Sequence, residues 1–191
     1  SVVLTEGRVV TAVMREISGA ISTGASTGLT STDTFKAKHV RYVVAKLRTA
    51  NAVPRKGSLY WCAIHPEVSH HLRAETGAAA WRDPHVYSAP SSIWAGEIGQ
   101  FEGAFFVETP RCYNAVDGGS GGNTVRAFRT LFAGQQALAE AVAEDFHVVV
   151  GEVTDKLKRF TPIGWYGVAG WKRYREASLY RVETTSSIDG S

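Results

Sequence analysis

The stretch GEIGQFEGAFFVETP, residues 96–110, decides the fold prediction for this chain. Its second part, Phe101–Thr109, is rich in aromatic and β-branched residues around one glycine, which predicts a strand or a hairpin that turns at that glycine. Pro110 has no amide N–H for a strand ladder and is expected to end the strand. Tight or left-handed backbone is expected at Gly96, Gly99 and Gly103.

A basic amphipathic helix is expected upstream of this stretch. Asp33 or Thr34 can cap its N-terminus, and Pro54 prevents its continuation. Four apolar residues recur at the i, i+3, i+4, i+7 spacing of one helix face: Val40, Val43, Val44 and Leu47.

A buried strand and a second helix are expected next. Leu59–Ile64 is a continuous apolar run, as in strands that are buried on both faces. It leads into a helix over Pro66–Thr76, whose first position suits Pro66 because an amide N–H is not needed there. Nearer the N-terminus, Ser1–Val13 predicts a strand or hairpin, and the Ser, Thr, Gly and Ala of Ser18–Thr32 predict a loop or flexible arm.

The downstream half is expected to consist mainly of strands and loops. Asp117–Asn123 (DGGSGGN) is expected to be a flexible loop, and Gln135–Ala143 a short Ala-rich helix. Strands are expected over Val125–Phe132, Phe146–Gly151 and Ile163–Thr184. The sum is an α+β domain, in which helices pack on a largely antiparallel sheet and long loops join the elements.

Composition and charge exclude several classes of protein. A hydrophobic fraction of 44% and a charged fraction of 20% are ordinary for a folded domain and exclude a disordered chain. The net charge is only +3, and the 21 basic residues are spread along the chain, unlike those of a dedicated nucleic-acid binder. No apolar run is long enough to span a bilayer and no secretory signal is seen, so a cytosolic product without a membrane partner is expected.

The two cysteines, Cys62 and Cys112, do not make a disulfide scaffold in a chain of this size. We expect both to be buried small hydrophobes in a reducing compartment.

No motif predicts a catalytic, cofactor-binding or metal-binding residue. His70 and His71 are adjacent, so a helix would point them about 100° apart, too far for one ion. Gly118–Gly122 lacks the Gly-Lys-Ser/Thr ending of a phosphate-binding loop. An acid–base pair remains conceivable among the carboxylates Asp83, Glu97, Glu102 and Glu108. A small cytosolic hydrolase therefore stays open as an alternative.

Tryptophans next to arginines say more about function than these catalytic and metal-binding motifs do. Trp and Arg are enriched at the centres of protein interfaces. We expect contacts between subunits at Trp81, Arg82, Trp94, Arg173 and Arg175. Trp171 can fill either a core or a contact. We also expect the loops Asp117–Asn123 and Ala78–Pro90 to lie at contacts or on exposed surfaces.

Collinear segments carry a resemblance to a known family. They are Arg48–Ala52, then Tyr60–Ile64 followed by His65-Pro66-Glu67-Val68, then Gly96-Glu97-Ile98-Gly99 leading through Gly103 to Glu108-Thr109-Pro110, then Phe132-Ala133-Gly134 with Ala137, and finally Gly170-Trp171-Lys172. In this order and spacing, Phe35 to Thr184 resembles the major capsid proteins of tailed phages, in the branch named after phage N-four.

The resemblance implies a shell protein of the Hong Kong ninety-seven type. Such a subunit packs into pentamers and hexamers of an icosahedral head around double-stranded DNA, with cement or scaffolding proteins as further partners. It would be assembled in the bacterial host cytoplasm and needs no cofactor. An encapsulin-like nanocompartment shell, which would enclose protein cargo, is the alternative with the same fold.

The resemblance also divides the chain. Residues 1–32 would belong to the peripheral lobe or arm, residues 33–184 to the capsid core, which is mainly the axial lobe with returning peripheral strands, and residues 185–191 to a polar tail. A long spine helix and a complete extended loop are not visible, and Ser1–Thr32 is too short to supply both. We therefore expect either a subunit that is incomplete at its N-terminus or disordered segments that are left out of this sequence.

Overall fold

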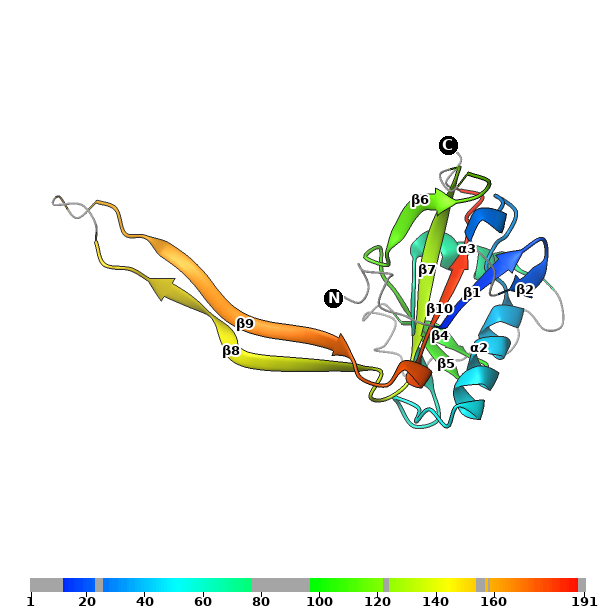
Figure 1. The fold of residues 1–191 in the computed structure, drawn as a ribbon, viewed down its shortest axis with the longest axis horizontal. Coiled ribbons are helices and arrows are strands. Elements are labelled where there is room, and N and C mark those ends of the chain that lie inside the picture. The colour runs from blue at the N-terminus through cyan, green and yellow to red at the C-terminus, as the bar shows by residue number, and fades with distance from the viewer. Residues whose placement is uncertain are drawn as a thin grey trace. The chain divides into compact units, whose positions relative to one another are not determined.

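The computed structural model describes residues 12–22, 26–76, 97–121, 124–153, 157 and 159–188. The chain divides into two compact units. The first, called the body, combines Ser1–Ala137 with Arg175–Ser191, and the second, called the hairpin, is Leu138–Tyr174 (Figure 1).

The described part of the body is built on a mixed eight-stranded sheet. Its strand order is β2–β1–β10–β7–β3–β5–β4, with β6 also paired to β7. The pairs β1/β10 and β3/β5 are parallel and the others antiparallel, so the expectation of a largely antiparallel sheet holds. The strands are β1 (Ala12–Ile17), β2 (Ala20–Ser22), β3 (Tyr60–Ile64), β4 (Glu97–Phe101), β5 (Ala104–Glu108), β6 (Asn114–Gly118), β7 (Val125–Ala133) and β10 (Leu179–Thr184).

In the described residues, two α-helices and two short 3₁₀ turns accompany this sheet. They are α2 (Ala37–Thr49), α3 (Pro66–Ala74), η2 (Ser26–Gly28) and η4 (Glu176–Ser178). The predicted apolar face of α2 is fully buried, and it packs in one cluster with side chains from β3, β5, β7 and β10. Within this core, the rings of Phe106 and Phe132 meet edge to face with centroids 6.1 Å apart.

The N-terminus of α2 differs from the prediction. Its cap residue is Lys36, whose backbone N–H donates to Nδ1 of His39 at 2.8 Å. The Asp33 carboxylate is already used, because it accepts hydrogen bonds from the backbone N–H and the hydroxyl of Thr30. Asp33 therefore closes a turn before the helix, and the predicted cap at Asp33 or Thr34 is wrong.

The prediction from the deciding stretch is confirmed in its described part. β4 and β5 form an antiparallel hairpin, and Glu102 and Gly103 turn it with positive φ values of 49° and 85°. β5 ends at Glu108, two residues before Pro110. Gly99 has a φ of 136° at an irregularity in the β4/β5 register. Gly96 lies outside the described residues, and Glu97 is placed only as the first residue of β4.

The predicted helix over Gln135–Ala143 is wrong. Residues from Leu138 to Val150 form one long strand, β8, which pairs with β9 (Ile163–Arg173). The Ala-rich start favours a helix by propensity alone, but pairing with a long second strand overrides that weak preference.

Two predicted loops contain more structure than expected. Ser18–Thr32 includes β2 and η2. In Asp117–Asn123, Asp117 and Gly118 complete β6, and the N–H of Gly119 donates to the carbonyl of Ser26. Gly118 and Gly119 are buried, whereas Ser120 and Gly121 are exposed as expected.

Candidate functional site

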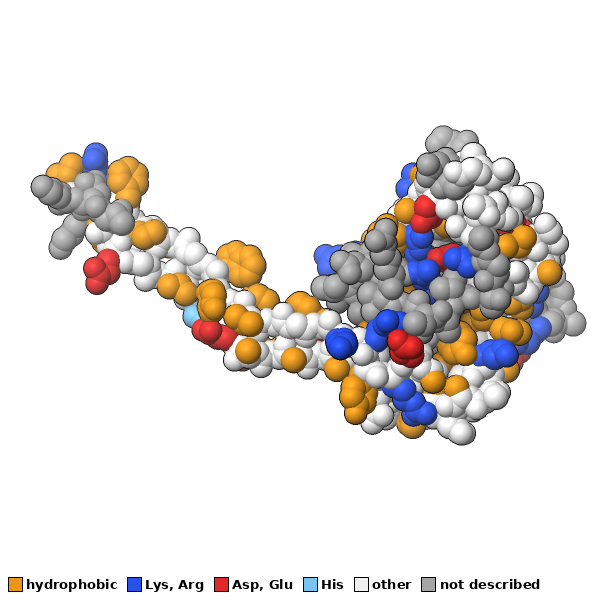
Figure 2. Space-filling model, in the orientation of Figure 1, with side chains coloured by type: hydrophobic (Ala, Val, Ile, Leu, Met, Phe, Trp, Pro, Cys, Tyr) orange, Lys and Arg blue, Asp and Glu red, His pale blue; other side chains and the backbone are white. Residues whose placement is uncertain are grey.

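The hairpin is the most apolar exposed surface in the described residues. Val148 lies opposite Trp165 and Val150 opposite Ile163, and side chains two residues apart share a strand face. These four side chains are named the apolar ladder. They are 67%, 76%, 62% and 71% exposed, respectively. Figure 2 shows further hydrophobic side chains, in orange, along the hairpin.

Aromatic contacts across the strands order this surface. The rings of Phe146 and Trp165 lie with centroids 5.7 Å apart, and those of His147 and Tyr166 lie 6.2 Å apart. Gly167 makes room for the first pair, because a Cβ at that position would come within 2.4 Å of the Phe146 ring. The exposed aromatic residues are therefore held in place before any partner covers them.

Three of the residues singled out in the sequence lie together on β9. Trp171 is 44% exposed and pairs with Glu140, Lys172 is exposed and pairs with Ala139, and Arg173 is half-buried. Trp171 thus belongs to the hairpin surface and not to a core. The other predicted contacts Trp81, Arg82 and Trp94, and with them the loop Ala78–Pro90, lie outside the described residues.

Arg175 and Gly134 have visible contacts within the body. The guanidinium of Arg175 donates to the carbonyls of Ala50 and Asn51, both at 3.2 Å, and so satisfies groups at the C-terminal end of α2. Gly134 leaves β7 where a Cβ would lie 2.8 Å from the carbonyl oxygen of Val53. Gly134 is therefore required by close backbone packing.

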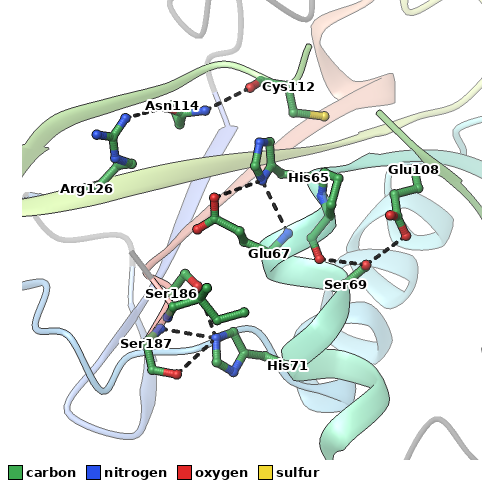
Figure 3. A network of polar contacts seen from close by, with 12 residues as sticks. His65, Glu67, Ser69, His71, Glu108, Cys112, Asn114, Arg126, Ser186 and Ser187 are labelled. Atoms are coloured by element: carbon green, nitrogen blue, oxygen red, sulfur yellow. Dashed lines mark hydrogen bonds and ion pairs between the residues drawn. The ribbon is translucent and has the colours of Figure 1, made fainter. Parts of the chain in front are cut away.

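A polar network surrounds α3 (Figure 3). The helix begins at Pro66, as predicted, and Nδ1 of His65 accepts the N–H of Glu67 at 3.3 Å as its cap. The Ser69 hydroxyl lies 2.9 Å from Oε2 of Glu108 on β5. The first bond caps the helix, and the second links α3 to β5 of the sheet.

His71 on α3 holds the segment that follows β10. Its Nε2 accepts the backbone N–H of Ser187 at 3.1 Å and lies 3.2 Å from the hydroxyl of Ser186 (Figure 3). Burial lowers the pKa of His71, and the neighbouring His70 lowers it further. Because a backbone N–H already occupies the Nε2 lone pair, this serine–histidine arrangement is suited to a tether and poorly suited to activating a hydroxyl.

A buried hydrogen bond between a neutral histidine and a carboxylate links β1 to α2. His39 and Glu16 are 0% and 1% exposed, and Nε2 of His39 lies 2.6 Å from a Glu16 oxygen. Since Nδ1 accepts from Lys36, Nε2 must carry the proton and donate it to the carboxylate. Burial lowers the pKa of His39. Burial would raise the pKa of Glu16, but hydrogen bonds from Lys38 and His39 outweigh it and lower that pKa.

A second buried cluster crosses three strands. Glu183 on β10 lies directly opposite Arg15 on β1 and Arg129 on β7. Its oxygens lie 2.5 Å from Arg15, 2.9 Å from Arg181 and 3.2 Å from Arg129, and Arg129 also pairs with Asp117. Burial lowers the pKa of Arg181, and Glu183 opposes that shift. This cluster cross-links the centre of the sheet.

The described residues offer little for metal or thiol chemistry. Cys62 and Cys112 are both buried free thiols, as predicted. Burial raises the pKa of Cys112 to about 12, and burial also raises the pKa of Cys62. Among the described residues, no three His, Cys, Asp or Glu side chains converge as a metal site would require. In that same part of the chain, no helix is long and apolar enough to cross a membrane.

Comparison with known proteins gives one family and several similar folds. A family model described as "Phage capsid protein" matches residues 7–188. No curated protein matches the sequence. The fold is similar to the capsid of Ralstonia phage GP4, with 21% identity and a TM-score of 0.66 over 85% of this chain and 50% of that one.

Two further solved capsid structures have a similar fold. The cyanophage Pam1 capsid asymmetric unit has 15% identity and a TM-score of 0.68, over 94% of this chain and 55% of that one. The capsid of Helicobacter pylori bacteriophage KHP30 has 10% identity and a TM-score of 0.56, over 80% and 59%. The chain thus spans about half the length of the first two capsid chains.

Proposed function

Given that the chain belongs to the phage capsid protein family, which the match over residues 7–188 establishes, we propose that it is a structural, non-catalytic subunit that assembles with copies of itself into pentamers and hexamers of an icosahedral phage head. The expected α+β fold of the Hong Kong ninety-seven type is confirmed. The head would enclose double-stranded DNA and form in the host cytoplasm, with scaffolding or cement proteins as further partners.

The exposed apolar ladder is the observation that carries this proposal. A two-stranded ribbon is marginal by itself in water, since it has no second layer to bury its side chains. All four ladder residues are more than 60% exposed, and contiguous apolar surface of this kind marks an interaction site. The hairpin therefore needs a covering surface that it does not supply itself.

We assign that covering surface to a neighbouring subunit. A shell repeats one heterologous contact around each ring, so each copy needs a donor surface and an acceptor surface. An aromatic-bearing ribbon suits the donor role because aromatic side chains bury large apolar surfaces at subunit contacts. This chain spans about half the length of the similar capsid chains. A further part of the same polypeptide is therefore the alternative surface that could cover the apolar ladder.

The test compares assembly of the complete capsid protein with that of a ladder variant. The variant carries Ile163→Ser and Trp165→Ser, and a control carries Val53→Ser and Val116→Ser, at two valines of the body that are 47% and 46% exposed. Sedimentation and negative-stain electron microscopy measure shells and rings, and thermal unfolding of the unassembled protein measures folding.

Wild-type and control proteins should form closed shells or rings, while the ladder variant stays unassembled with an unchanged melting temperature. If the ladder variant melts much earlier, the rest of its own chain covers the ladder, and the neighbour assignment is wrong. If the wild-type protein remains monomeric in the presence of the other head proteins, the shell function is wrong. Shells that hold protein cargo and no DNA would indicate a nanocompartment.

A further inference from the structure

The strand β9 has an outer edge that no other strand of the described residues covers. β8 and β9 form a two-stranded sheet, so each of them pairs on one side only (Figure 1). An edge of this kind presents a row of backbone N–H and C=O groups that can pair with another chain. The apolar ladder lies on a face of the hairpin, so the β9 edge is a separate surface.

The two strands of the hairpin differ in how their edges are protected. Proteins protect a strand edge with charged side chains, β-bulges or proline. β8 carries the exposed acids Glu140, Glu144 and Asp145, and both irregularities in the register add a residue to β8. From Ile163 to Trp171, β9 has no charged residue, no proline and no inserted residue. The β9 edge is therefore the one that is open to pairing.

Two glycines of β9 are not explained by packing within the hairpin. Glycine inside a strand weakens it, and often marks a place where another backbone approaches closely. Gly167 makes room for the Phe146 ring, but a Cβ on Gly164 or Gly170 would meet nothing within 4 Å in the described residues. These two glycines therefore suit an approach from outside the hairpin.

The sequence of β9 has nearly the same pattern in both directions. Residues 163–171 read IGWYGVAGW, with Gly167 at the centre. When a second copy runs antiparallel about this centre, glycines lie opposite glycines and apolar or aromatic residues lie opposite one another. The opposed pairs are Gly164 with Gly170, Ile163 with Trp171, Trp165 with Ala169, and Tyr166 with Val168. Cross-strand pairs of aromatic and apolar residues stabilise a sheet, and a shift by one residue would instead place both tryptophans opposite glycines.

The charges at the ends of the strands are compatible with the same alignment. The N–H of Gly151 donates to the carbonyl of Pro162, so the hairpin register continues toward Glu152. In the antiparallel pair, Arg173 of one copy lies in the same row as Glu152 of the other, with Thr161 between them. Opposite charges in one row attract each other, and no like charges meet across the shared edge from 161 to 173. A second copy of β9 is thus complementary to the edge in both pattern and charge.

We propose that β9 pairs antiparallel with β9 of a second copy, across a two-fold axis centred on Gly167. The strands β8, β9, β9 and β8 then form one sheet, held by backbone hydrogen bonds, with the acidic β8 strands at its two outer edges. Residues directly opposite each other point to the same face, so the two apolar ladders lie on one side of this sheet. Such a contact is isologous, because both copies use the same surface. It rests on the proposed assembly of copies and adds to the ladder contact a second one, across a two-fold axis.

The test is disulfide cross-linking between two variants of the complete capsid protein, Gly164→Cys and Gly170→Cys. The variants are mixed in equal amounts, assembled and treated with oxidised glutathione, and non-reducing gel electrophoresis measures the covalent dimer. In the proposed pairing the two new thiols are opposed, within the Cα separation of about 4.4–6.8 Å that a disulfide requires. Thiols at the same position in both copies are six residues apart, about 20 Å along the strand. Both sites have open space for the new side chain, and the native cysteines are buried.

Random mixing joins the two variants in about half of the two-fold contacts, so about half of the subunits should become dimers, and either variant alone should give none. Dimers from each variant alone would indicate parallel pairing and overturn the proposal. If the mixture forms shells without cross-links, another surface covers the β9 edge, and the pairing is wrong while the shell function stands. If wild-type protein does not assemble and the mixture gives no dimer, both the shell function and the pairing are wrong.

Discussion

Replacing Glu183 with Gln should remove the charge that holds the centre of the sheet together. The carboxylate is 1% exposed and faces Arg15, Arg129 and Arg181, which come from three adjacent strands. Gln preserves the shape and one acceptor oxygen, so the change tests charge and not volume. Removing one partner of a buried ion pair costs about 3–5 kcal/mol, because the remaining charge stays buried. We expect a loss near the lower end, about 3 kcal/mol.

The assay is urea unfolding of the unassembled protein, read as a change in midpoint at constant slope. For a slope of about 1–3 kcal/mol/M, the midpoint should fall by roughly 1–3 M. The matched control is Glu102→Gln, which breaks the exposed pair with Arg41 and should cost no more than about 1 kcal/mol. Equal losses for the two variants would refute the idea that burial makes the Glu183 cluster important.

Three further predictions follow from the body and the hairpin. Burial lowers the pKa of His39 below its ordinary value of 6.5. Below about pH 6.5 the unfolded chain therefore binds a proton at this residue more readily than the folded chain, and the free energy of unfolding should decrease as the pH drops. His39→Gln should flatten that fall in a pH series of urea titrations, whereas exposed His147→Gln should not. Gly134→Ala should lower the free energy of unfolding by about 1–3 kcal/mol, since the new Cβ would press on a backbone carbonyl. Gly164→Ala, where the Cβ meets open space, should lower it by less than about 0.5 kcal/mol in the same urea titrations. With its pKa at about 12, Cys112 should react with a maleimide far more slowly than free cysteine, and a rate equal to that of free cysteine would contradict its burial.

Local signals in the sequence predicted the elements whose determinants are themselves local. Pro66 after an apolar run predicted the start of α3, and Gly103 between aromatic residues predicted the β4–β5 turn. The cap of α2 was missed because Asp33 is an excellent cap by residue type but is engaged by Thr30 in the folded chain. The strand at Leu138 was missed because its partner lies about thirty residues further on, beyond any local pattern.

The surfaces were harder to predict than the fold. An apolar strand residue such as Ile163 or Trp165 has the same pattern whether a core or solvent lies beside it, so the sequence did not reveal the apolar ladder.

The place of β10 in the sheet has a consequence for how the protein is made. β10 comes after both β1 and β7 in the sequence, yet it lies between them in the sheet. Contacts between such distant segments are slow to form, and domains fold as units during synthesis. The body cannot close while the ribosome still holds residues 179–184, so a prematurely terminated chain leaves β1 without its parallel partner. A chain that ends before β10 would therefore lack the strand that joins β1 to β7.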